Sequence, residues 1–139
     1  MRFSVHLCFD GQCEEAFRTY QQVLGGQLVT LLKYGDSPLA AQTPIEWQNR
    51  ILHATLNLGV YELLGADLPS TEYGRPQGFF VTLSLSDFAK AQHIFAALAE
   101  GGEIKMPFQP TFWAAGFGVL VDRFGVPWEI NCGQAESAA

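Results

Sequence analysis

The feature that most constrains this chain is an internal repeat with a period of 76 residues, the separation between Gly25 and Gly101. Two segments of similar pattern, residues 3–9 and 79–85, are separated by the same interval, and each half contains one Gly-Gly pair at the corresponding place. Self-similarity at a fixed spacing indicates a fold built from copies of one supersecondary unit. The chain is therefore predicted to consist of two related halves.

Each half has the pattern of a strand, a helix and three further strands. Residues 3–9 and 79–85 alternate apolar and polar side chains, as half-buried strands do. Helices are predicted over residues 13–24 and 88–100, and the Gly-Gly pairs that follow are typical of a left-handed helix end. The remaining strands are expected at residues 27–33, 50–58 and 60–65, and at 103–108, 116–121 and 126–132.

These patterns predict an α+β fold made of two βαβββ modules. One module leaves a face of its sheet uncovered, so the two must pack together or exchange with a second chain. The expected result is a curved, cup-like mixed sheet with the helices on its outer face. The 139 residues are predicted to form a single domain, with modules at 1–67 and 79–132 and a linker at 68–78.

Composition argues against several classes of partner. The net charge is −6 with only eight Lys and Arg residues, so the surface would repel nucleic acid. Apolar runs long enough for a membrane span, and an apolar signal segment at the N-terminus, are both missing from the sequence. No glycine-rich phosphate loop indicates a nucleotide cofactor. Three cysteines without a paired spacing predict reduced thiols and a cytoplasmic protein.

Strand alternation predicts four polar side chains on the faces away from the helices: His6, Glu62, Thr82 and Glu129. If the two modules form one curved surface, these side chains converge. One imidazole and two carboxylates suit a divalent cation, with Zn, Ni, Mn, Mg and Fe all open, and Thr82 or water would complete the shell. Glu129 has an alternative interpretation as a solvated strand residue. A register slip of one residue would turn Glu62 away.

Other polar residues are predicted to have structural roles. These are a hydrogen bond at a strand entry for His53, half-buried helix packing for His93, and turn formation for Asp67 and Asp122.

Aromatic residues supply a second kind of candidate site. Trp113 and Phe117, together with Phe80 and Thr82 on the predicted open face, are candidates to line an apolar pocket. Trp47 belongs to the same class of candidate. The same aromatic side chains would equally suit closure of one end of the fold or a subunit contact.

The paired modules, with His6 on a first strand and glutamates on the hairpin strands, resemble the vicinal oxygen chelate superfamily. That group includes glyoxalase I, extradiol dioxygenases and bleomycin-resistance proteins. The segments DGQCEEAFRTYQQVLGG, HATLNLGVYELLGAD and FWAAGFGVLVDRFGVPWEI are similar to its PhnB-like branch, and the similarity extends from Val5 to Asn131.

The resemblance implies that one residue from the first strand and one from the last strand of each module hold a metal. Carried over, these are His6, Glu62, Thr82 and Glu129. Thr82 departs from the pattern, since a His or Glu is usual at that place.

Three functions follow from these observations. The first is a metal-dependent enzyme acting on a small oxygen-chelating substrate, with His6, Glu62 and Glu129 as ligands. Glu129 is the expected catalytic base, and Glu62 is the alternative. The second is a metal-free protein that binds small molecules, and the third is a structural dimer with a vestigial cleft. The resemblance implies a homodimer in each case. Methyltransferase activity is not expected, because no loop for S-adenosylmethionine is present.

Overall fold

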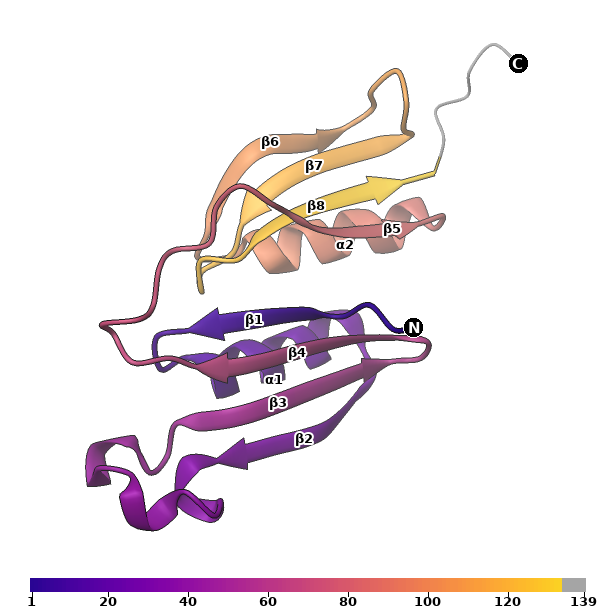
Figure 1. Ribbon diagram of the computed structural model, residues 1–139. Helices are drawn as coiled ribbons and strands as arrows, with labels where there is room; N and C mark the ends of the chain where they lie inside the picture. Colours follow the sequence, from indigo (N-terminus) through magenta and orange to yellow (C-terminus); the bar gives the residue numbers. More distant parts are fainter. Residues whose placement is uncertain (134–139) are drawn as a thin grey trace. The chain divides into compact units, whose positions relative to one another are not determined.

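The structure is a computed structural model that describes residues 1–133. The chain forms two compact units, Met1–Gly74 and Arg75–Ala139, and each is a βαβββ module (Figure 1). The predicted α+β class and the two-module repeat are confirmed. Neither helix in residues 1–133 has the length and apolar character needed to cross a membrane.

The first unit contains one helix on a four-stranded mixed sheet. Along the chain its elements are β1 (Val5–Phe9), α1 (Cys13–Leu24), β2 (Gln27–Lys33), β3 (Ile51–Leu58) and β4 (Tyr61–Asp67). The strand order is β1-β4-β3-β2, with β1 parallel to β4 and the other pairs antiparallel. Three short 3₁₀ turns lie between β2 and β3: η1 (Tyr34–Asp36), η2 (Ala40–Gln42) and η3 (Ile45–Trp47).

The second unit repeats this topology without the turns. Its elements are β5 (Val81–Leu85), α2 (Phe88–Ala99), β6 (Glu103–Gln109), β7 (Gly116–Val121) and β8 (Pro127–Cys132). The strand order is β5-β8-β7-β6, and only the β5–β8 pair is parallel. The second half is shorter here, because residues 110–115 join β6 to β7 whereas residues 34–50 join β2 to β3.

Each helix packs on one face of the sheet in its own unit (Figure 1). In α1 the fully buried Phe17 lies edge-on to Phe9, with ring centroids 6.1 Å apart. Gly65 on β4 allows this approach, because a Cβ there would lie 2.4 Å from the Phe17 ring. Gly118 on β7 plays the same part beneath Phe95 of α2, where a Cβ would lie 2.5 Å from the ring.

The predicted helix ends are confirmed. Gly25 and Gly101 have φ angles of 82° and 74°, in the left-handed region that glycine adopts at low cost. At the other end of α2, the Asp87 carboxylate accepts a hydrogen bond from the Lys90 amide at 3.1 Å. Helix α1 differs, because Gln12 at its N-terminus makes no side-chain cap.

Asp67 supplies the missing cap of α1, so its prediction as a turn former was wrong. Its carboxylate is 1% exposed and accepts hydrogen bonds from the amides of Cys13 at 3.0 Å and Ile51 at 2.8 Å. β4 extends two residues beyond its predicted end and carries Asp67 into the core. Asp122 does form the predicted turn, accepting from the amides of Phe124 and Val126.

The first strands begin two residues later than predicted. Phe3 and Phe79 lie outside β1 and β5, and both rings are exposed rather than packed beneath a helix. The ladders begin only at the pairs Val5–Leu63 and Val81–Trp128. His93 on α2 is also exposed, so its predicted half-buried packing was wrong.

Candidate functional site

Strand register assigns the side chains that lie on the helix-free face of the second unit. Thr82 pairs with Glu129, and Glu129 in turn pairs with Val119 on β7. Registered neighbours share a face, and alternation places these residues opposite Gly118, whose position faces α2. Thr82 and Glu129 therefore lie side by side on the face away from the helix, as predicted.

The hydroxyl of Thr82 donates a hydrogen bond to Oε1 of Glu129 at 2.8 Å. Thr82 is exposed and Glu129 is half-buried. Ion pairs among residues 1–133 include Arg2 with Glu62, Arg18 with Glu14, Arg50 with Asp10 and Lys105 with Glu103. Within that part of the chain, Glu129 has no cationic partner.

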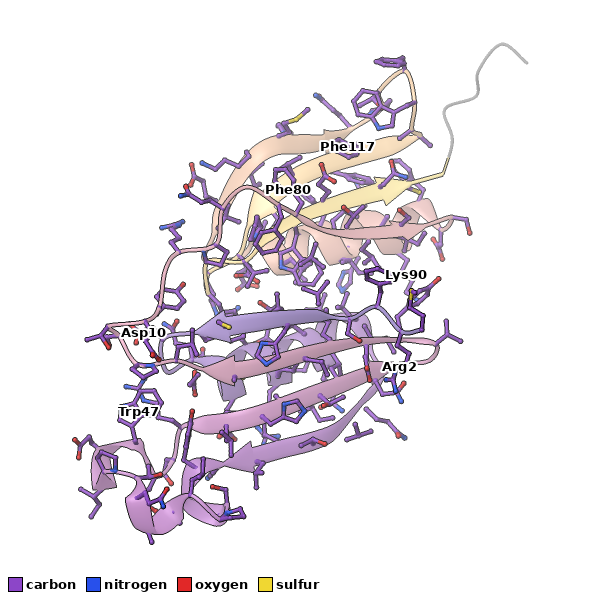
Figure 2. All side chains as sticks on the ribbon, in the orientation of Figure 1. Arg2, Asp10, Trp47, Phe80, Lys90 and Phe117 are labelled. Atoms are coloured by element: carbon purple, nitrogen blue, oxygen red, sulfur yellow. The ribbon has the colours of Figure 1, made fainter. Side chains whose placement is uncertain are left out.

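Beside this pair stands a stack of three aromatic rings. Phe117 pairs with Asn131, which places it on the same face, one step along the sheet from Glu129. The Trp113 ring lies 5.2 Å from the Phe117 ring, and the Phe112 ring lies 4.8 Å from Trp113, both edge to face. Figure 2 shows Phe117 on β7. We call the group Thr82, Phe112, Trp113, Phe117 and Glu129 the Glu129 face.

The loop that carries Trp113 is held in shape by hydrogen bonds. The Thr111 hydroxyl accepts from the Ala114 amide at 3.1 Å, and the Ala115 amide donates to the Cys132 carbonyl at 3.0 Å. Trp113 is nevertheless 44% exposed and Phe112 is 89% exposed. Sequence reasoning missed Phe112, although its place beside Trp113 in a short loop was a visible signal.

Two other aromatic candidates do not join this stack. Phe80 lies just before β5 and is exposed, and no ring contact links it to Trp113 or Phe117 among the described residues (Figure 2). Trp47 belongs to the turn region of the first unit, where its ring lies 5.4 Å from Tyr34. The Arg50 guanidinium lies 4.8 Å above the Trp47 ring.

The helix-free face of the first unit carries two histidines and a cysteine. The rings of His6 and His53 are 6.4 Å apart, and Cys8 Sγ lies 3.7 Å from His6 Nδ1. His53 makes the structural hydrogen bond predicted for it, with Nε2 3.3 Å from the Thr55 hydroxyl. Partial desolvation, and next the charge of His53, lower the pKa of His6. Burial raises the pKa of the Cys8 thiol.

Glu62 is engaged with its own neighbours. Its Oε1 accepts hydrogen bonds from the Arg2 guanidinium and, at 2.9 Å, from the Ser4 hydroxyl. The registered partner of His6 is Leu64, so Leu64 stands where Glu129 stands in the second unit. Glu62 lies two residues earlier on the same strand.

The donors of the first unit do not fit a metal ion. Glu62 is paired with a guanidinium, and a leucine stands opposite His6. Neither unit, within residues 1–133, contains a group of three His, Cys, Asp or Glu side chains arranged to hold one. The set His6, Glu62 and Glu129 stays a prediction, and we derive no reaction step through a metal.

Comparison with known proteins decides the family. The family model of the glyoxalase/bleomycin resistance protein/dioxygenase superfamily matches residues 4–130. The chain belongs to this superfamily. The family resemblance seen in the sequence is thereby confirmed.

Three relatives illustrate the similarity. Protein YjdN of Escherichia coli K12 is 33% identical, with 94% of this chain and 95% of YjdN covered. The crystal structure of PA1353 from Pseudomonas aeruginosa is 42% identical, with a TM-score of 0.86 and coverage of 97% and 99%. The PhnB protein from Bacillus cereus is 21% identical, with a TM-score of 0.81 and coverage of 96% and 100%, and shares the fold.

Proposed function

We propose that this superfamily member binds a small organic molecule without a metal, using the Glu129 face. The observation that supports it is the stack of Trp113 on Phe117, exposed next to the Thr82–Glu129 pair. Ligand sites combine apolar and aromatic area with a few placed polar groups. The Glu129 face has both, and its main-chain framework is fixed by β7, β8 and the Thr111 hydrogen bonds.

The alternative proposal of a metal-dependent enzyme, with Glu129 as base, has weaker support. It requires His6 and Glu62 as additional ligands, and Glu62 is already paired with Arg2. It also requires a ligand at Thr82, whose hydroxyl is a poor donor for a divalent cation.

The test is a screen of planar one- and two-ring aromatic compounds by NMR, following the backbone amides of the wild-type protein. Binding should shift the amides of Thr82, Phe117 and Glu129. Trp113→Ala should weaken the binding of the best compound about tenfold or more, because it removes one of the two rings, Trp113 and Phe117, that the compound would contact. Shifts confined to other residues would contradict the proposal.

Tyr61→Ala is the matched control. Tyr61 is an exposed aromatic residue of β4 that lies on the helix side of its own sheet, in register with Leu58. Its removal should leave the affinity unchanged. An equal loss in both variants would show that the compound binds exposed aromatic rings without selection.

The proposal also includes a cytoplasmic homodimer. Cys8, Cys13 and Cys132 are all free, and the last two are buried, which suits a reducing compartment. Light scattering coupled to size-exclusion chromatography would test the dimer, and a mass of one chain, 15.3 kDa, would contradict it.

A further inference from the structure

The Glu129 carboxylate is the charged group of this face that a ligand would contact. An ionised carboxylate can accept about four hydrogen bonds, and this one accepts one, from Thr82. By contrast, the carboxylates of Asp10, Glu14, Glu62 and Glu103 have Lys or Arg partners from the chain itself. Glu129 therefore retains free acceptor capacity on an accessible face.

The position of the aromatic stack relative to this carboxylate suggests the shape of the ligand. Phe117 and Glu129 are diagonal neighbours on adjacent strands, and such neighbours lie roughly 7–8 Å apart. Trp113 extends the aromatic surface on the far side of Phe117. The Trp113 and Phe117 planes are inclined at 68°, so a planar two-ring molecule can lie on the Phe117 ring with Trp113 against its side. In that position it would place a substituent within reach of the carboxylate.

Charge favours a cation at that substituent. A positive group near Glu129 gains an ion pair, and an aromatic cation that lies over the face of the Phe117 or Trp113 ring also gains a cation–π contact. The whole chain has a net charge of −6, which raises the local concentration of cations and lowers that of anions.

We infer that the Glu129 face selects planar aromatic cations, with the ring system packed in the angle between Phe117 and Trp113 and the positive group at Glu129. This inference rests on the proposed function and adds the class of ligand to it. A neutral molecule of the same shape binds more weakly, and an anion is rejected.

The experiment uses three probes of matched shape with the full-length protein: 1-methylquinolinium, 1-methylnaphthalene and 1-naphthoate. Dissociation constants come from NMR titration of the Thr82, Phe117 and Glu129 amides. The cation should bind about tenfold more tightly than the neutral probe, as expected from one ion pair with a cation–π contact. Glu129→Gln should remove this preference by weakening the binding of the cation.

Glu100→Gln is the matched control, because it changes the net charge equally. Glu100 is an exposed residue at the C-terminal end of α2, on the helix side of the sheet. It should preserve the preference for the cation. A second measurement needs no variant. Raising the salt concentration should weaken the binding of the cation and leave the binding of the neutral probe unchanged.

The outcomes separate the two proposals. Equal binding of cation and neutral probe, or preference for 1-naphthoate, would overturn the cation inference and leave the small-molecule function standing. If no probe shifts the amides of the Glu129 face, both proposals fall. Preference for the cation that survives Glu129→Gln would also overturn the inference, since the selectivity would then lie elsewhere.

Discussion

Asp67 joins three elements of the first unit through one buried carboxylate. It ends β4, caps the first turn of α1 through the Cys13 amide, and holds the start of β3 through the Ile51 amide. A carboxylate at a helix N-terminus also meets the positive end of the helix dipole. Asp67 therefore has a structural role at the N-terminus of α1.

Asp67→Ala should therefore destabilise the protein strongly. Two buried amides lose a charged acceptor, which we expect to cost about 3 kcal/mol in the free energy of unfolding. Urea denaturation would measure this cost. Asp36→Ala, at an exposed acid of η1, should change stability by less than about 0.5 kcal/mol. Similar effects of both substitutions would rule out the capping role.

His6 should titrate below its ordinary range. Desolvation is the larger cause of its lowered pKa and the charge of His53 the second. The midpoint of its imidazole signal in a ¹H NMR titration is expected below 6.5, the value for an unperturbed histidine. His53→Gln should raise the midpoint without restoring it fully, with the His93 signal as internal reference. A midpoint unaffected by the substitution would exclude the coupling.

The same shift has a definite sign for stability. Because the folded-state pKa of His6 lies below that of the unfolded chain, the unfolded state binds this proton more readily. The contribution of neutral His6 is therefore present above about pH 6.5 and is lost as the pH falls through the folded pKa.

At the scale of elements, the two helices begin in different ways although they occupy equivalent places in the repeat. Helix α2 carries its own cap, Asp87, which accepts from the Lys90 amide. Helix α1 is capped from β4, by a residue 54 positions away in the chain. The capping of α1 thus depends on correct packing of its sheet.

Asp87→Ala should lower the free energy of unfolding by about 1 kcal/mol, the usual value of a lost N-cap. The equivalent change at α1, Gln12→Ala, should have almost no effect, because the Gln12 side chain makes no capping hydrogen bond. Thermal unfolding of both variants beside the wild-type protein would show the difference. Equal losses would mean that the caps of the two helices do not differ as described.

Strand register is the element-scale property that sequence patterns predicted least well. Alternation correctly places Glu62 on the helix-free face, but the residue opposite His6 is Leu64. In the second unit, Thr82 and Glu129, which were predicted only to share this face, are paired directly. The glutamate of the first unit is thus shifted by two residues along its strand relative to Glu129 in the second. A shift of two residues keeps a side chain on the same face, so the alternation pattern does not reveal it.

At the scale of the whole molecule, the stability of the protein should not depend on a divalent metal. A bound ion at about a hundred times its dissociation constant would add roughly 2.7 kcal/mol of stability, on the order of ten degrees in Tm. Because the donors of the first unit do not fit a metal, we expect chelation followed by addition of Mg²⁺, Mn²⁺, Ni²⁺, Co²⁺ or Zn²⁺ to leave Tm nearly unchanged.

The decisive variant in this experiment is His6→Gln. The contrary result is a rise in Tm of about ten degrees with one ion in the wild-type protein, and no rise in His6→Gln and Glu129→Gln. That result would establish the metal ligands predicted from the sequence and contradict metal independence. Thermal unfolding of the wild-type protein in the presence of chelator is the reference for both variants.

The architecture could be predicted from the sequence, because the signals for it are local. Gly-Gly pairs mark helix ends, alternation marks strands, and the 76-residue period shows that the same unit occurs twice. These properties depend on residues a few positions apart, and the helices at Cys13–Leu24 and Phe88–Ala99 follow them closely.

The contacts between distant residues could not be predicted from the sequence. The burial of Asp67, the pairing of Glu62 with Arg2 and the position of Leu64 opposite His6 all join residues more than 50 positions apart. Such contacts depend on how strands align and how a helix docks, and packing of many side chains sets both. The place of Phe117 beside Glu129 also comes from strand pairing, although over a shorter separation, since it requires β7 and β8 to be paired in one register.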